Sequence, residues 1–270
     1  MMFKIKEVKE TIEELAPVYL KESYDNVGLM VGSLNWDVSN ILIALDCTMN
    51  VIEEAKEKNC SLIITHHPLL FNKPSTITDE SLVGIKLITL IQNNIALYSS
   101  HTNLDSVNGG LNDIFAELLG FTDYSIIEHN DLNNDKEQHG IGRLVTLNCP
   151  VSLFDICTNV KTTLGITSLR YVGELSKQIK KIALINGSGE DFYKISHKCG
   201  ADLIITGDTK YHHTSDFHEM GLCIIDAGHF ETEWPAFKVF SRKLEKKLQQ
   251  LGYEKGIIIS ESSTPLYRYL

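Results

Sequence analysis

The chain has 270 residues, of which 43% are hydrophobic, so it is long enough for one large domain or two ordinary ones. Its formal net charge is −10 at pH 7 and no basic face stands out, which disfavours a nucleic-acid-binding function. No apolar stretch approaches the roughly 18 residues of a membrane span, and the start MMFKIKEVKE lacks the apolar run of a signal peptide. We therefore expect a cytoplasmic protein with no membrane association.

Short runs of β-forming residues alternate with segments of helical period along the chain. In GGLNDIFAELLG, for example, Leu111, Ile114, Phe115 and Leu118 lie on one side of a helix, and Gly120 caps its end. Continuous apolar strands between helices indicate an α/β fold whose sheet is covered on both faces. In chain order we predict strand 41–46, helix 48–59, strand 61–65, helix 81–94, strand 95–100, helix 109–120, strands 181–186, 201–206 and 222–226, and helix 236–250.

The order of these elements looks repeated. The runs IAL and LIIT occur in this order twice at about the same spacing, and a third strand follows each time. The third strand leads into His101 in the first case and His229 in the second, which makes these two residues candidates for equivalent positions. We predict two similar α/β halves, 1–125 and 179–270, that face each other across a metal-binding cleft, with a connecting segment 126–178 that holds a small β-α-β piece. Chance similarity between short apolar strands is the alternative.

Polar side chains follow the carboxyl ends of several predicted strands. His66 and His67 come directly after SLIIT, Asp105 lies shortly after IALYSS, and His229 lies shortly after LCIID. Open α/β sheets bind ligands beyond the carboxyl ends of their strands, and histidine combined with carboxylates is the composition of a metal site. Adjacent histidines that leave a strand point in different directions, so His66 and His67 can bind two neighbouring ions. The alternative is a pair that only makes hydrogen bonds in the loop.

Glu233 completes the predicted metal site. His229 and Glu233 are four residues apart, which brings both to one face if a helical turn has begun. Pro235 disfavours helical conformation just before it, so we expect the helix to start only near Glu233. Two cations roughly 3.5–4 Å apart need shared negative charge, and we assign the bridging carboxylate to Glu233 and a terminal position to Asp105. For the H-x-x-x-E pattern alone, a solvated surface pair is the alternative.

Other polar residues offer weaker signals. We consider His101 and His212 as candidate proton donors, and the alternative for His212 is a solvated helix face. The turn at 187–189, Gly-Ser-Gly, could hold an anion on its backbone amides, although such turns are common. We predict that four further histidines lie on the surface: His129, His139, His197 and His218.

Six segments carry a resemblance to a known family. They are ESYDNVGLMVG (22–32), ALDCT (44–48), THHPLLF (65–71), SSHTNLD (99–105), TGDTKYHH (206–213) and GHFETE (228–233). In this order, and over nearly the whole chain, they resemble the Nif-three-like family, also called GTP cyclohydrolase I type 2 homologues. The resemblance implies a ring-shaped homohexamer built from trimers. It also implies a dinuclear site between two α/β halves, with five ligands: His66, His67, Asp105, His229 and Glu233.

The ligand set and the resemblance together favour a metal-dependent hydrolase. Metal-activated water would attack a purine nucleotide, as in GTP cyclohydrolase chemistry, or a phosphoester, so we expect a small-molecule substrate such as a nucleotide. Imidazole and carboxylate ligands suit two divalent ions of Zn, Fe, Mn or Co. The sequence leaves open a non-catalytic metal-binding scaffold or regulatory adaptor, and a metallochaperone.

Overall fold

The computed structural model of the chain describes residues 3–129, 139–268 and 270. The predicted α/β class is confirmed, and the strands form two sheets. The chain divides into two compact units, the first made of Met1–Leu104 and Phe237–Thr264, the second of Asp105–Ala236 and Pro265–Leu270. None of the described helices combines the length and the apolar character that crossing a bilayer requires.

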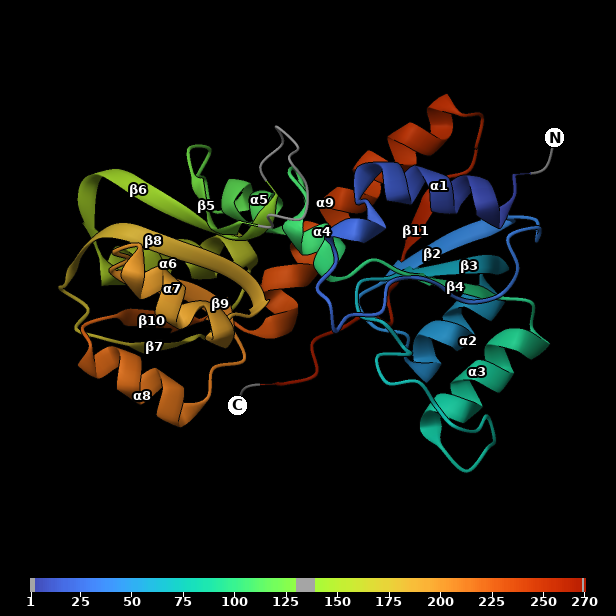
Figure 1. Cartoon of the computed structure of the whole chain (residues 1–270), viewed down its shortest axis with the longest axis horizontal. Coiled ribbons are helices and arrows are strands. Elements are labelled where there is room, and N and C mark those ends of the chain that lie inside the picture. The colour runs from blue at the N-terminus through green and yellow to red at the C-terminus, as the bar shows by residue number, and fades with distance from the viewer. Residues whose placement is uncertain (1–2, 130–138, 269) are drawn as a thin grey trace. The chain divides into compact units, whose positions relative to one another are not determined.

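The first unit contains a five-stranded sheet in the order β1-β4-β3-β2-β11 (Figure 1). The pairs β11 with β2, β2 with β3 and β3 with β4 are parallel, and β1 is antiparallel to β4 at one edge. Strand β11 comes late in the sequence, so a segment distant from the other four strands forms the edge of the sheet beside β2. The strands are β1 (Gly28–Val31), β2 (Asn40–Ala44), β3 (Cys60–Thr65), β4 (Ala96–Ser99) and β11 (Ile257–Ile259).

Helices cover both faces of this first sheet (Figure 1). Helices α2 (Met49–Glu57) and α3 (Leu82–Gln92) pack their buried residues against β2, β3 and β4 on one face. Helix α1 (Ile5–Leu15) lies on the other face with the later part of α9 (His229–Gln250), and the 3-10 helix η1 (Val18–Leu20) follows α1. This arrangement explains why the strands read as continuous apolar runs, because neither face meets water.

The second unit contains a six-stranded sheet in the order β5-β6-β8-β9-β10-β7. Strands β8, β9 and β10 are parallel, whereas β5 and β6 form an antiparallel extension on one side and β7 pairs antiparallel with β10 on the other. The strands are β5 (Ser125–His129), β6 (Gly140–Ser152), β7 (Arg170–Val172), β8 (Gln178–Ser188), β9 (Leu203–Gly207) and β10 (Cys223–Asp226).

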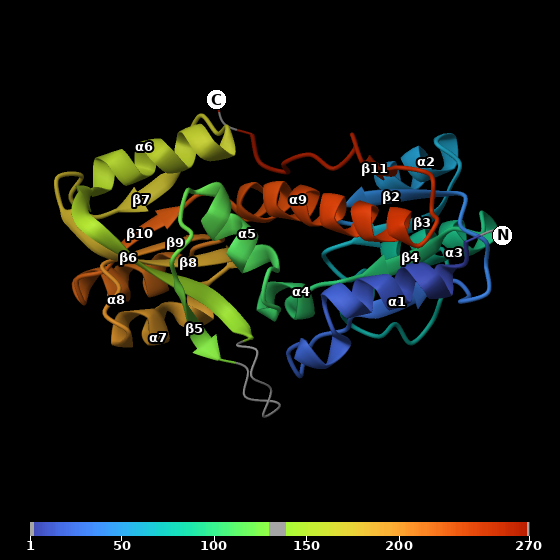
Figure 2. The ribbon, with the colours of Figure 1, turned by 90° about the horizontal axis from the view of Figure 1, so that it is seen from above.

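Two hydrophobic clusters flank the second sheet. Helices α5 (Leu111–Leu118) and α6 (Leu153–Leu164) contribute to one cluster, and α7 (Tyr193–Lys198) contributes to the other, against which Phe217 of α8 (Tyr211–Glu219) packs. Figure 2 shows α6 on one side of the sheet and α7 and α8 on the other. The 3-10 helix η2 (Glu190–Phe192) joins β8 to α7.

The units do not coincide with the predicted halves. The range 126–178, which we expected to be a connecting segment, supplies β6, α6 and β7 to the second unit, and β6 pairs antiparallel with β8. Helix α5, expected in the first half, also belongs to the second unit. Hydrophobic period identifies an element but carries no information about which sheet the element joins, and this is the reason for the difference.

The two sheets nevertheless share a run of pairings. Each has three parallel strands followed by an antiparallel edge strand, β2-β3-β4-β1 in the first and β8-β9-β10-β7 in the second. Ser100 and Ala227 occupy the same position, directly after β4 and β10, where each amide donates to the preceding parallel strand. His101 therefore corresponds to Gly228, and His229 lies one residue beyond the position that we expected to be equivalent.

Candidate functional site

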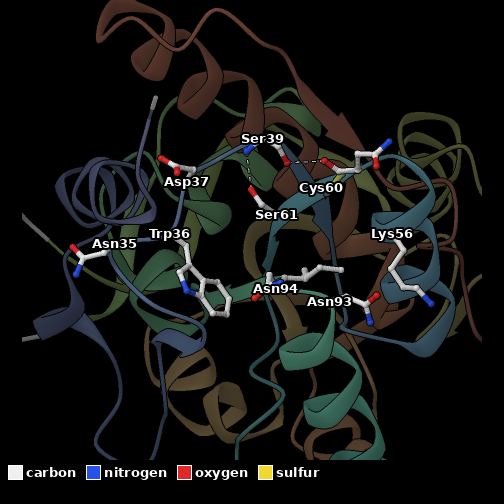
Figure 3. Close-up of a pocket in the computed structure, with 11 residues that line it drawn as sticks. Asn35, Trp36, Asp37, Ser39, Lys56, Cys60, Ser61, Asn93 and Asn94 are labelled. Carbon is white, nitrogen blue, oxygen red and sulfur yellow. Dashed lines mark hydrogen bonds between the residues drawn. The ribbon is translucent and has the colours of Figure 1, made fainter. Parts of the chain in front are cut away.

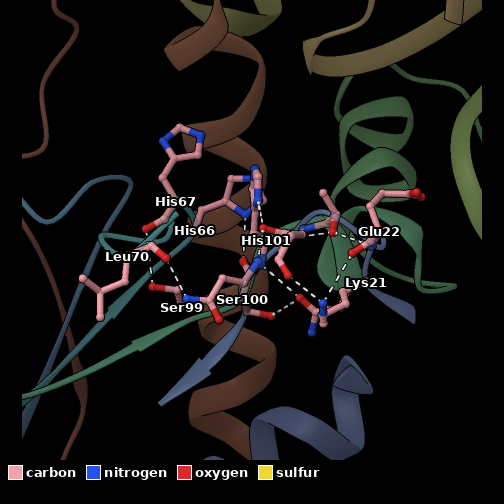
Figure 4. A network of polar contacts seen from close by, with 12 residues as sticks. Lys21, Glu22, His66, His67, Leu70, Ser99, Ser100 and His101 are labelled. Atoms are coloured by element: carbon pink, nitrogen blue, oxygen red, sulfur yellow. Dashed lines mark hydrogen bonds and ion pairs between the residues drawn. The ribbon is translucent and has the colours of Figure 1, made fainter. Parts of the chain in front are cut away.

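Three histidines come together at the carboxyl edge of the first sheet (Figure 4). The parallel neighbours β3 and β4 end at Thr65 and Ser99, so His66, His67 and His101 leave the sheet at the same edge. One ligand nitrogen from each of the three lies within 4.8 Å of the other two. His66 is buried and the other two are half-buried. Three imidazoles at this spacing can bind a divalent metal ion.

Each of these imidazoles is held through its Nδ1 atom by an oxygen of the same unit. An imidazole oriented in this way presents its Nε2 atom as the ligand, and the oxygen fixes the direction of the ring. The three oxygens are the Ser100 carbonyl at 2.8 Å from His66, the Asp46 carboxylate at 2.8 Å from His67, and the Asp25 carboxylate at 2.9 Å from His101. The histidine triad, as we call His66, His67 and His101, is thus supported before any ion binds.

Asp25 is the most strongly anchored of these supports. Its buried carboxylate accepts hydrogen bonds from the Thr102 hydroxyl at 2.5 Å, the Thr102 amide at 3.1 Å and the Asn26 amide at 2.8 Å. Burial alone would raise the pKa of Asp25, but the hydrogen bonds and charge of His101 and the bonds from Thr102 hold it well below its usual range. Asp25 therefore stays ionised and keeps the His101 ring in place.

Sequence reasoning missed both carboxylate supports of the triad. Asp46 follows β2 by two residues, so the rule that polar residues gather at strand ends could have identified it. Asp25 precedes β1, whose antiparallel direction brings the beginning of the strand to the edge where β4 ends. That direction is a property of the sheet, and no local sequence signal shows it.

In the second unit, His229 and Glu233 lie one helical turn apart at the start of α9. Nε2 of His229 is 3.1 Å from a carboxylate oxygen of Glu233, and its Nδ1 is 2.6 Å from a carboxylate oxygen of Asp208. The expected helix start near Glu233 is wrong, because α9 begins at His229 and Pro235 lies inside it. The Thr232 amide bonds to the carbonyl before His229, so the first turn closes ahead of the proline.

The two carboxylates set the charge of His229. Burial alone would lower the pKa of His229, but the hydrogen bonds to Asp208 and Glu233 raise it to about 11. The hydrogen bond from His229 in turn holds the pKa of Asp208 below its usual value. Without a metal, the cluster is a cationic imidazolium between two carboxylates, and a bound cation would take the place of the proton.

Asp226 joins the two loops that carry Asp208 and His229. Its buried carboxylate accepts from the amide and the hydroxyl of Thr209, at 3.1 and 2.7 Å, and from the amide of Gly228 at 3.0 Å. Arg170 also forms an ion pair with it. One carboxylate at the end of β10 therefore fixes the residue after Asp208 and the residue before His229.

Gly187 leaves the space that the Glu233 carboxylate occupies. Its φ is +61°, and a methyl group at this position would overlap a carboxylate oxygen of Glu233 and lie 3.4 Å from Nε2 of His229. The Gly187 amide donates to the Thr232 hydroxyl at 2.9 Å, so it is not available to an anion as we had considered. The glycine therefore allows the strand to approach the His229 and Glu233 side chains closely.

The structure places Asp105 in the second unit, within α4 (Thr102–Ser106). Asp105 is buried, and its carboxylate accepts from the Asn186 side chain at 2.8 Å. The Asn112 side chain donates to the Asp105 carbonyl at 3.1 Å. Because Asn186 directly precedes Gly187, one strand end contacts both Asp105 and the helix that carries Glu233.

The remaining histidines differ from one another in position. His212 is exposed on α8, where its ring contacts Tyr211 with centroids 5.4 Å apart, and the structure does not bring it to His229. His139 is buried and accepts from the Asn108 amide at 3.2 Å, so the prediction of a surface position was wrong. His129 and His218 are exposed, as predicted.

A separate pocket of about 690 Å³ is drawn in Figure 3. It lies at the amino ends of β2, β3 and β4, whereas the histidine triad lies at the carboxyl ends of β3 and β4. Trp36 and Lys56 contribute to its walls together with several asparagines. Two of these, Asn59 and Asn94, follow α2 and α3 with φ of 51° and 54°. Asparagine in this conformation ordinarily ends a helix, so these side chains have a structural explanation.

Comparison with known proteins gives a consistent result over the whole chain. The family model described as Duf34/NIF3 (NGG1p interacting factor 3) matches residues 3–265. A Clostridium acetobutylicum protein named "GTP cyclohydrolase 1 type 2 homolog" is 50% identical over 269 residues, which cover 100% of both chains. A Clostridium perfringens protein of the same name is 52% identical, with 99% of this chain and 100% of that one covered.

Solved structures agree with these sequence matches. The crystal structure of a hypothetical protein from Staphylococcus aureus superimposes with a TM-score of 0.87 at 29% identity and covers 100% of both chains. The similarity therefore extends over both units.

Proposed function

The chain belongs to the Duf34/NIF3 (NGG1p interacting factor 3) family, and from this premise we propose that it binds two divalent metal ions and hydrolyses a small molecule. The proposed ligands are His66, His67, Asp105, His229 and Glu233, with His101 as a further nitrogen donor. The observation that carries the proposal is the histidine triad, whose ligand nitrogens lie within 4.8 Å of one another and whose rings are each held through Nδ1.

The chemistry of the donor set fits divalent ions. Imidazole nitrogen combined with carboxylate oxygen suits zinc, iron, manganese and cobalt. Glu233 and Asp105 supply the negative charge that two neighbouring cations require, and both carboxylates are buried, which strengthens their attraction for a cation. Asp25, Asp46 and Asp208 are the outer residues that orient the imidazoles.

The proposed reaction is hydrolysis of GTP, another nucleotide or a phosphoester. Bound divalent ions would lower the pKa of water towards neutrality and polarise the group that is attacked. The chain's own contribution in the first unit is a set of three imidazoles that scarcely needs to rearrange, because two carboxylates and one carbonyl already hold the rings. The name of the clostridial relatives supports a purine nucleotide as substrate. The exposed position of His212 gives no support to the predicted proton donor.

We also propose that the chain assembles into a homo-oligomer, for which the family resemblance implies a hexamer. Helix α3 leaves Leu82 and Ile85, which are three residues apart and so lie on one face of the helix, exposed at 60% and 37%. Apolar side chains gathered on a surface commonly mark a contact with another chain. Sedimentation velocity of the purified protein tests this part, and a monomer at micromolar concentration would contradict it.

The hydrolase proposal is tested by metal-dependent turnover. Protein freed of metal and reloaded with zinc, iron(II), manganese or cobalt should hydrolyse GTP or a simple phosphoester. His67→Ala should abolish this activity, whereas His218→Ala, which removes an exposed histidine, should not. Metal binding without turnover of any substrate would contradict the hydrolase and favour a metal-binding scaffold. Full activity of His67→Ala would contradict the assigned ligands.

A further inference from the structure

The first unit leaves two large aromatic rings exposed near each other. Tyr24 is 65% exposed and Phe71 is 46% exposed, and their ring centroids lie 6.3 Å apart at an interplanar angle of 56°. Leu69 and Leu70, which precede Phe71 in the chain, pack against the hydrophobic core of the unit. Phe71 does not follow them, although burial of an aromatic ring ordinarily stabilises a fold.

This aromatic pair, Tyr24 and Phe71, lies beside the histidine triad. The Phe71 ring meets the His101 ring edge to face, with centroids 6.5 Å apart and an interplanar angle of 78°. Tyr24 directly precedes Asp25, whose carboxylate holds His101. Phe71 therefore lies in the same loop as His66 and His67, and Tyr24 lies in the loop that holds the His101 ring through Asp25.

A hydrogen bond fixes the loop of Tyr24 to the loop of Phe71, and a second bond lies within the loop of Tyr24. The Asn26 side chain donates to the Leu70 carbonyl at 2.7 Å, which joins the segment of Tyr24 to the segment of Phe71. Lys21 donates to the Asp25 carbonyl at 2.6 Å. Figure 4 shows Lys21 and Leu70 in the polar network around the triad. An aromatic surface held by such a backbone is ready to receive a ligand without further ordering.

The chemistry of two exposed rings selects for one class of ligand. A planar heterocycle gains dispersion and stacking energy on an aromatic surface, whereas a phosphate group gains little. Binding sites for small molecules combine such surfaces with a few polar groups or a metal. We propose that Tyr24 and Phe71 bind the planar heteroaromatic ring of the substrate and so favour nucleosides and nucleotides over phosphoesters that lack an aromatic ring. This inference rests on the proposed function, because the neighbouring triad is where such a substrate would react.

Calorimetric titration of the zinc-loaded protein tests the inference with two probes, guanosine and ribose 5-phosphate. Phe71→Leu should weaken guanosine binding about tenfold, as expected for loss of one contact between a base and an aromatic ring. Phe154→Leu is the matched control, because Phe154 is 57% exposed on α6 in the second unit, and it should bind guanosine as wild type does. Phe71→Tyr should restore binding, and ribose 5-phosphate should bind all variants equally.

Several results would overturn the inference. It is wrong if wild type does not bind guanosine, if Phe71→Leu binds it unchanged, or if both probes lose affinity equally. A change in sedimentation of Phe71→Leu without a change in guanosine binding would assign the rings to a contact between chains. If Phe71→Leu does not fold, Tyr24→Trp carries the test, because guanosine should quench the emission of the new indole. Selective guanosine binding without turnover supports this inference while contradicting the proposed hydrolase.

Discussion

The candidate ligands of the two units are held in different ways. In the first unit, Asp25, Asp46 and a backbone carbonyl each hold one ring of the histidine triad through Nδ1. In the second unit, both nitrogens of His229 are engaged by carboxylates, Asp208 at Nδ1 and Glu233 at Nε2. The first set is therefore arranged as a ligand set, whereas the second is a closed ion cluster that must release a proton to accept a metal ion.

This difference indicates which residues would govern the proposed metal binding in each unit. In the first, affinity should depend on how firmly the rings are oriented, since orientation is what the outer carboxylates provide. In the second unit, metal affinity should depend on pH and on the two carboxylates that hold the His229 ring, those of Asp208 and Glu233.

The largest loss of bound metal is expected from removing the Glu233 carboxylate. Glu233→Ala should lower the content of both ions together, because the proposal gives this carboxylate to both cations. Asp105→Asn should lower mainly one ion, since Asp105 is assigned to a single ion and Asn186 holds its carboxylate. Metal analysis by plasma mass spectrometry checks this pair. Equal losses in the two variants would show that Glu233 has no bridging role.

The supports of the first unit should matter in proportion to their burial. Asp25→Asn should weaken metal binding by roughly 10–100-fold, the range for outer residues that orient a ligating histidine. The side chain of Asp25 is fully buried, whereas that of Asp46 is 54% exposed, so Asp46→Asn should have the smaller effect. Asp37→Asn is the control, because Asp37 is similarly exposed and pairs with Lys4. Competition titration with a zinc chelator measures the zinc affinity of the three variants. Equal zinc affinities of Asp25→Asn and Asp37→Asn would refute the role of Asp25.

Metal binding in the second unit should strengthen as pH rises. The pKa of His229 is raised from its ordinary 6.5 to about 11, so the ion cluster stabilises the metal-free fold fully below pH 6.5. That contribution is lost as pH rises towards 11, and the metal then competes with fewer protons. Zinc affinity should increase by about tenfold per pH unit where one proton is exchanged. His229→Ala should flatten the slope measured between pH 6.5 and 9, and an unchanged slope would show that His229 is not the residue that titrates.

The smallest effect concerns two glycines with similar backbone conformations. Gly187 and Gly165 have φ of +61° and +67°, so alanine at either position should cost about 1–2 kcal/mol in the free energy of unfolding. A methyl group at Gly165 has nothing within 4 Å, whereas one at Gly187 would overlap the Glu233 carboxylate. Only Gly187→Ala should also weaken metal binding. Urea denaturation and zinc titration of both variants check this, and equal zinc affinities would contradict the role given to Gly187.

Local pattern was sufficient to predict much of the fold and part of the site. The apolar runs identified the strands, and the polar residues after them pointed to His66 and His67, which the structure brings together with His101. These predictions succeed because each depends on residues that are neighbours in the sequence. A strand ends where its apolar run ends, and parallel neighbours end at the same edge of the sheet.

The features that could not be predicted depend on distant pairings. Asp25 reaches His101 only because β1 pairs antiparallel with β4, and Gly187 matters only because α9 passes beside the end of β8. The early start of α9 was missed because the rule for the residue before proline is a local tendency, which the bonds of His229, Thr232 and their neighbours override. The boundaries of the two units likewise follow from sheet pairing.

The most direct test of the central claim is anomalous X-ray diffraction at the zinc absorption edge from crystals soaked in zinc. We predict anomalous peaks within bonding distance of the Nε2 atoms of the histidine triad and of the Glu233 carboxylate. Peaks only at other residues, or none in a crystal that diffracts well at the edge, would contradict it.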